Sequence, residues 1–129
     1  MSFPVLICDD SNMARRMVQR SLPCDWDVEI FTAENGQQAL DILQQQHIAL
    51  LFLDLTMPEM DGLEVLQAVK DQGIETYVLV ISGDIQPQMR QRVMALGALD
   101  FISKPVDSLR IYQILERYGF YSYSELASA

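Results

Sequence analysis

Residues 48–62 read Ile-Ala-Leu-Leu-Phe-Leu-Asp-Leu-Thr-Met-Pro-Glu-Met-Asp-Gly, and this stretch decides the fold. An apolar run, Ile48 to Leu53, ends at a single carboxylate, Asp54. The run is too short for a helix, and consecutive apolar residues are typical of a strand buried on both faces of a parallel sheet. The turn signal Asp61-Gly62 then precedes a helical pattern. We interpret the stretch as a buried parallel strand, a loop and the start of a helix.

The alternation of a short apolar run with an amphipathic stretch occurs five times along the chain. The expected strands are Val5–Cys8, Val28–Thr32, Ile48–Leu53, Tyr77–Ile81 and Leu99–Ile102. Apolar side chains at helical spacing follow each run, beginning with Ala14, Met17, Val18 and Leu22. The pattern predicts an α/β fold of (βα)5 type, a doubly wound parallel five-stranded sheet with helices on both faces.

Composition limits the partners and the compartment. The chain has 129 residues, half of them hydrophobic, which suits one core. A net charge of -9 opposes binding to nucleic acid or to an anionic membrane. The apolar runs are far shorter than the roughly 20 residues of a membrane span, and a basic leader is missing from the amino terminus. We therefore expect a cytoplasmic protein whose Cys8 and Cys24 are reduced.

Polar side chains follow four of the expected strands. Asp9 and Asp10 follow the first strand, Asp54 the third, Ser82 the fourth and Lys104 the fifth. In open α/β sheets, ligands bind outside the carboxyl ends of the strands, so these groups should share one crevice. Three carboxylates without His or Cys call for a hard cation such as Mg²⁺. The sequence therefore predicts a phosphoryl-handling site with a bound divalent metal ion.

Each of these residues also has an ordinary interpretation when it is taken alone. Asp9-Asp10 could cap the first helix, Ser82 could be a strand-end hydroxyl, and Lys104 could be a solvated surface lysine. These alternatives leave unexplained why all of the groups follow strand ends.

The residues resemble the response-regulator receiver domains of two-component signalling, a CheY-like family with a flavodoxin-like fold. The resemblance covers residues 4–118. It rests on Asp9-Asp10, on residues 53–62, on Ser82-Gly83, and on Gly97-Ala98 running to Lys104-Pro105. It implies the strand order 2-1-3-4-5. We expect a receiver domain over residues 1–118, with 119–129 as a tail or as the start of a linker to a further domain.

The resemblance also assigns the chemistry. Asp54 is expected to accept a phosphoryl group from a phosphohistidine donor. Mg²⁺, with Mn²⁺ as a substitute, is expected on Asp10, Asp54 and the backbone carbonyl of Thr56, while Asp9 acts mainly through water. Ser82 and Lys104 suit the remaining phosphoryl oxygens.

The switch and the phosphoryl lifetime follow from the same resemblance. Phe101 matches the aromatic residue that turns inward when the Ser82 hydroxyl moves toward the phosphoryl group, although it could also be an ordinary half-buried strand residue. A cis peptide bond is expected between Lys104 and Pro105. Thr56 and Asp84 are expected to flank the path of the hydrolytic water.

The expected partners are a histidine kinase or phosphotransfer protein, and an output protein or fused output domain. The output face would be formed by the fourth helix, the fifth strand and the fifth helix. Its candidate residues are Met89, Arg90, Arg92, Asp107, Arg110 and Glu116. We do not expect a turnover enzyme.

Three rival functions can be weighed on the residues. A phosphatase of the haloacid-dehalogenase type needs a second Asp two residues after the nucleophile, where this chain has Thr56. A flavodoxin-like FMN binder would not place Asp9-Asp10 beside its phosphate. A degenerate receiver that serves only for contacts would not need the complete set of site residues.

Overall fold

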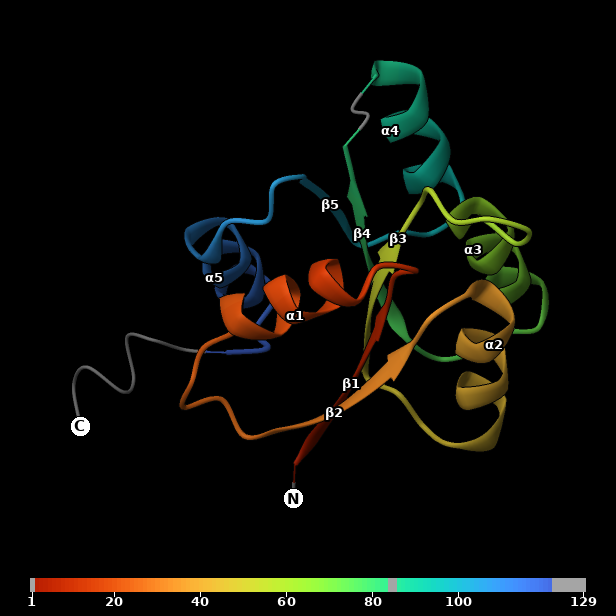
Figure 1. The fold of residues 1–129 in the computed structure, drawn as a ribbon. Coiled ribbons are helices and arrows are strands. Elements are labelled where there is room, and N and C mark those ends of the chain that lie inside the picture. Colours follow the sequence, from red (N-terminus) through yellow and green to blue (C-terminus); the bar gives the residue numbers. More distant parts are fainter. Residues whose placement is uncertain (1, 84–85, 122–129) are drawn as a thin grey trace.

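A computed structural model describes residues 2–83 and 86–121 of the chain. Strands and helices alternate strictly along these residues (Figure 1). The strands are β1 (Phe3–Cys8), β2 (Val28–Ala33), β3 (Leu50–Asp54), β4 (Tyr77–Ser82) and β5 (Asp100–Ser103). The helices are α1 (Asn12–Ser21), α2 (Gly36–Gln45), α3 (Gly62–Asp71), α4 (Pro87–Ala95) and α5 (Ser108–Arg117). The predicted (βα)5 order is confirmed.

All five strands are parallel, in the order β2-β1-β3-β4-β5. From β1 the chain passes to β2 on one side, and it then crosses to β3 on the other side of β1. The order of the strands therefore reverses between β1 and β3. In the register of these two central strands, Cys8 pairs with Leu53. The residues that follow this pair are Asp9 and Asp54, so both carboxylates leave the sheet at the same edge.

Helices cover both faces of the sheet, as Figure 1 shows. On one face, α1 and α5 pack on alternate residues of the central strands, such as Ile7 and Phe52. On the other face, α2, α3 and α4 pack on the intervening residues, such as Leu6 and Leu53. All five residues of β3 are buried, which explains why its sequence is apolar without alternation.

The predicted strand limits were wrong by one or two residues. β1 begins at Phe3 because its first two residues already pair with β2, and the Phe3 N–H donates to the Asp27 carbonyl at 2.9 Å. β3 begins at Leu50, two residues later than predicted, although Ile48 is buried at 1% exposure. An apolar run indicates which residues are buried. In β3, burial begins before the residues that pair with the neighbouring strands.

The helices differ in how firmly their first turns are fixed. Side chains of Ser11, Asn35, Asp61 and Asp107 accept hydrogen bonds from the first turns of α1, α2, α3 and α5. Helix α4 has no such bond and buries only one residue, Val93. A helix with few buried contacts and no cap is the least costly to displace.

The chain continues past α5 along the edge where the strands begin. Gly119, at a φ of 80°, ends the helix, and Phe120 N–H donates to the Leu115 carbonyl at 2.8 Å. Tyr121 then donates a hydrogen bond to Asp25 at 2.8 Å and meets the edge of Trp26. These contacts place Phe120 and Tyr121 against the sheet, whereas residues 122–129 of the expected tail lie outside the described residues.

Two further expectations concern the cysteines and membrane spans. Both thiols are free, as predicted, with Cys8 buried and Cys24 exposed. None of the helices within residues 2–83 and 86–121 is long and apolar enough to span a bilayer.

Candidate functional site

Three carboxylates meet where β1 and β3 end. Oxygen atoms of Asp9, Asp10 and Asp54 lie within 4.8 Å of one another. Asp9 and Asp54 are buried, at 4% and 3% exposure, and Asp10 is exposed. Among the described residues, this is the one group of three acidic side chains that could share a metal ion. The predicted convergence of the strand ends is therefore confirmed for these residues.

Lys104 reaches the carboxylates from the far edge of the sheet. The backbone N–H of Lys104 donates to the Ser82 carbonyl at 2.9 Å, and this bond fixes the start of the loop after β5. The Lys104–Pro105 peptide bond is cis, as the resemblance implies. The Lys104 Nζ lies 3.3 Å from Asp9 Oδ2 and 3.3 Å from Asp54 Oδ1. One ammonium group therefore bridges the two buried carboxylates.

The charges in this crevice perturb one another. Burial raises the pKa of Asp54, and the negative charge of Asp9 raises it further, against the opposing effect of Lys104 and of the Thr56 N–H. Burial lowers the pKa of Lys104, but the carboxylates of Asp54 and Asp9 outweigh it, so this pKa is raised. The ammonium of Lys104 therefore stays charged, while the ionised form of Asp54 is held at an electrostatic cost.

The donor set fits a hard divalent cation. Three carboxylates face one ammonium group, so the site keeps an excess of negative charge. All of the candidate ligand atoms are oxygens, which Mg²⁺ prefers, and the exposed Asp10 leaves room for the waters that Mg²⁺ keeps. The loop residue Thr56 is exposed and follows directly on Leu55, whose N–H donates to the Ile81 carbonyl at 3.2 Å.

The loop between β3 and α3 is tightly constrained beside Asp54. A side chain at Gly62 would come within 2.5 Å of the Asp54 carbonyl oxygen, so only glycine fits there. Glu59 adopts a positive φ of 66°, which is uncommon for residues other than glycine. Strained backbone of this kind often accompanies functional loops.

Arg15 is a positioning residue that the sequence reasoning missed. Its side chain is buried, and Nη1 donates to the Asp9 carbonyl at 2.6 Å. The guanidinium also bonds Asn12 and lies 3.8 Å from a Glu34 carboxylate oxygen. Arg15 thus fixes the backbone of the acidic pair. A basic residue one turn into the helix that follows two acidic residues was the available signal.

Ser82 is the last residue of β4 and is 1% exposed. It pairs in register with Ser103, directly before Lys104. The structure therefore places Ser82 at the carboxyl end of its strand, as predicted. Asp84, the other candidate in this segment, lies outside the described residues.

Phe101 points into the core and is 3% exposed, so it is more buried than the half-buried strand aromatic of the alternative interpretation. The guanidinium of Arg90 on α4 lies 5.7 Å from the centre of its ring, and Arg110 on α5 donates to its carbonyl at 3.4 Å. Two arginines therefore tie α4 and α5 to the same strand residue.

The candidate residues of the output face are mostly accessible. Arg90, Arg92, Asp107 and Glu116 are exposed, whereas Met89 and Arg110 are half-buried. Asp100 is the centre of this face, because Arg110, Arg117 and Tyr118 all reach its carboxylate.

Comparison with protein families identifies the family to which this chain belongs. The family model of the response regulator receiver domain matches residues 5–116. The chain belongs to the response-regulator receiver family. The role of this family is to accept a phosphoryl group in two-component signal transduction, and magnesium and an aspartyl phosphate are general features of its members.

Curated relatives of this receiver domain include proteins of its own length and longer ones. It is 31% identical over 117 residues to the chemotaxis protein CheY of Bacillus subtilis, an alignment that covers 91% of this chain and 98% of CheY. It is 38% identical over 104 residues to a protein-glutamate methylesterase/protein-glutamine glutaminase of Clostridium acetobutylicum, covering 78% of this chain and 30% of the relative. The chain thus spans nearly all of CheY but less than a third of the methylesterase.

Solved structures of receiver domains have the same fold. The chemotaxis protein CheY4 of Vibrio cholerae superimposes with a TM-score of 0.81 at 30% identity, covering 91% of this chain and 98% of CheY4. The signal receiver domain of NarL from Mycobacterium tuberculosis gives a TM-score of 0.82 at 28% identity, covering 91% of this chain and 95% of that domain.

Proposed function

We propose that Asp54 is the phosphoacceptor of this receiver domain and that it is phosphorylated by a phosphohistidine donor in a Mg²⁺-dependent reaction. The observation that carries the proposal is the buried Asp54 carboxylate, which shares its crevice with two acidic residues and with the ammonium of Lys104. In the reaction, an Asp54 oxygen attacks the phosphorus, the bond from phosphorus to nitrogen breaks, and the donor histidine leaves with the electron pair.

Asp9, Asp10, Asp54 and the Thr56 carbonyl are the proposed metal ligands, with Asp9 acting mainly through water. When bound, Mg²⁺ would neutralise charge on the phosphoryl oxygens during transfer. Arg15 would keep Asp9 in place through its bond to the backbone carbonyl. Lys104 would exchange part of its contact with Asp9 and Asp54 for a phosphoryl oxygen, and the Ser82 hydroxyl would donate to another.

This chain has a surface beside the crevice on which a phosphoryl donor protein could dock. A cavity of about 390 Å³ lies between α1 and the loop after β5, lined mainly by apolar residues such as Met17, Pro105 and Val106. Met13 on the same helix is 73% exposed. We propose that a histidine kinase or phosphotransfer protein packs an apolar surface here, which would bring its phosphohistidine to Asp54.

The response would be carried by α4, β5 and α5. Helix α4 is the least anchored helix, and Arg90 links it to Phe101. If Ser82 shifts toward the phosphoryl group, α4 can move at little cost. An output protein or a fused output domain would read this change, with residues 1–118 acting as the receiver in the cytoplasm.

The proposal is tested with acetyl phosphate and intact-protein mass spectrometry. The parent protein should gain one phosphoryl group in the presence of Mg²⁺ and none in EDTA. Asp54→Asn should gain none, whereas Asp41→Asn, which changes an exposed carboxylate on α2, should behave like the parent. An Asp54→Asn variant that gains the same mass would refute the assignment.

A further inference from the structure

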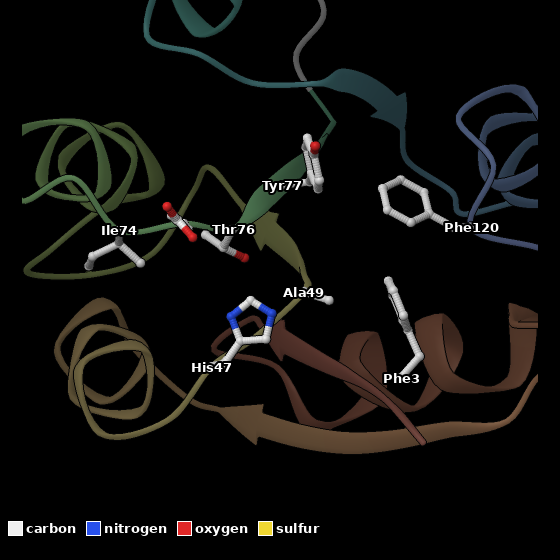
Figure 2. A pocket seen from close by; sticks show the side chains of 8 residues that line it. Phe3, His47, Ala49, Ile74, Thr76, Tyr77 and Phe120 are labelled. Atoms are coloured by element: carbon white, nitrogen blue, oxygen red, sulfur yellow. The ribbon is translucent and has the colours of Figure 1, made fainter. Parts of the chain in front are cut away.

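A second cavity lies at the opposite edge of the sheet from Asp54, where the strands begin. Its volume is about 420 Å³, within the range of ligand pockets. The lining includes Phe3, His47, Glu75, Thr76, Tyr77 and Phe120. Figure 2 shows these side chains around one opening, with Ala49 between them. The phosphorylation site contributes none of its residues to this cavity.

Aromatic side chains form one wall of this cavity. Phe3 and Tyr77 stand on the same side of the opening in Figure 2. The Phe120 ring supports both, with ring centres 5.6 Å from Phe3 and 5.6 Å from Tyr77. Tyr77 is 58% exposed although it begins a central strand. The wall therefore presents aromatic surface at an edge that solvent can reach.

The opposite wall offers hydrogen-bond acceptors. Figure 2 places His47 and Thr76 across the opening from the rings. Glu75 also lines the cavity. The Thr76 oxygen is buried, and within the described part of the chain it has no hydrogen-bond partner. Buried polar atoms are normally paired, and a rotation of the Thr76 side chain toward the cavity would give this oxygen a partner on a guest. The carboxylate of Glu75 adds further acceptor positions.

Charge decides between the possible guests. Glu75 is the one carboxylate among the lining residues, and none of them is Lys or Arg. An anion would therefore be repelled, whereas a cation can pair with this exposed carboxylate. A cation is also attracted by the faces of aromatic rings. A cavity with aromatic surface, hydrogen-bond acceptors and negative charge is complementary to an ammonium ion that carries an apolar group.

We propose that this cavity is a binding site for a small arylalkylammonium ion. The ammonium group binds between Glu75 and Thr76, and the flat aromatic body lies against Phe3 and Tyr77. This site is separate from the phosphoacceptor, so the protein carries a second recognition site at the far edge of its sheet.

Three probes of nearly equal shape and different charge test the proposal. They are 2-phenylethylammonium, 2-phenylethanol and phenylacetate, titrated into the ¹⁵N-labelled protein while the amide resonances are followed. The ammonium ion should give saturable shifts at Phe3, His47 and residues 75–77. The alcohol should bind at least fivefold more weakly, and phenylacetate should give no saturable shift. Trp26, whose ring centre lies 5.4 Å from that of Phe3, offers a fluorescence signal for the same titration.

Variants separate the charge from the aromatic surface. Glu75→Gln keeps the shape and should weaken binding of the ammonium ion about fivefold or more, bringing it close to the alcohol. Tyr77→Leu should weaken both probes. Glu64→Gln removes an exposed carboxylate from α3 and is the matched control, which should bind like the parent. Asp54→Asn should also bind like the parent, so this test does not depend on the phosphoacceptor assignment.

Several results would overturn the proposal. Equal affinity for the ammonium ion and the alcohol would show an apolar cavity without charge recognition. Unchanged binding in Glu75→Gln would exclude the proposed partner. Shifts confined to Asp9, Asp10 and Asp54 would show that the cation binds only at the acidic crevice.

Discussion

Replacing Asp54 by Asn should stabilise the metal-free protein, because the structure buries this carboxylate beside two others. The carboxylate oxygens lie within 4.8 Å of one another, and Coulomb's law at an effective dielectric of about 20 gives roughly 3.5 kcal/mol for two charges at that limit. The attraction of Lys104 at 3.3 Å is roughly 5 kcal/mol by the same rule. Repulsion from Asp9 and Asp10 together therefore exceeds the attraction by about 2 kcal/mol. Solvent screens the exposed Asp10 and reduces this excess, while burial of the Asp54 charge, the largest cause of its raised pKa, adds to the cost, so we expect a gain of about 1 to 2 kcal/mol.

The sign also follows from the raised pKa of Asp54. Between the ordinary pKa of an Asp and the higher value in the folded protein, the native state binds more protons than the unfolded state. Its stability therefore falls as the pH rises through this window. The gain in Asp54→Asn should accordingly be largest at pH values above this window and should shrink as the pH falls toward about 4.

Urea unfolding followed by Trp26 fluorescence measures this effect. In EDTA at pH 7.5, the midpoint of Asp54→Asn should lie about 0.5 to 1 M above that of the parent. Mg²⁺ at ten times its dissociation constant should stabilise the parent by about 1.4 kcal/mol and the variant by much less. Asp41→Asn, the exposed control, should match the parent. A midpoint of Asp54→Asn at or below that of the parent in EDTA would refute the electrostatic account.

Three further predictions concern the same crevice and its surroundings. Lys104→Ala should fold but respond weakly to phosphorylation, and amide shifts in β5 as large as those of the phosphorylated parent would contradict this role. Trp26 packs on Phe3 at the opposite edge of the sheet, so its fluorescence should barely change with Mg²⁺, and strong saturable quenching would count against this topology. Thr56→Asn should change the rate of autodephosphorylation at least roughly threefold, about 0.7 kcal/mol in barrier, with little change in Mg²⁺ affinity. An unchanged decay of the phosphoryl group would leave Thr56 without a role in hydrolysis.

The residues at the strand ends show how much of the site can be predicted from the sequence. Asp9, Asp54 and Lys104 could be assigned to one crevice because parallel strands must end at a common edge. The bridging position of Lys104 could not be predicted, since its Nζ reaches Asp9 and Asp54 only through the course of the loop after β5. Arg15 was missed although its position one turn into the helix was a signal, because its partner is a backbone carbonyl, which the pattern of side chains does not identify.

The sequence by itself determined the alternation of strands and helices, since burial on both faces of a strand demands apolar residues at successive positions. It also determined the chemical groups at the strand ends. Only the tertiary structure decided the inward position of Phe101, the stacking of Arg90 on its ring, and the meeting of Phe3, Tyr77 and Phe120 around a cavity. These contacts join residues far apart in the chain, and their geometry depends on how helices and loops pack on the sheet, which local patterns do not encode.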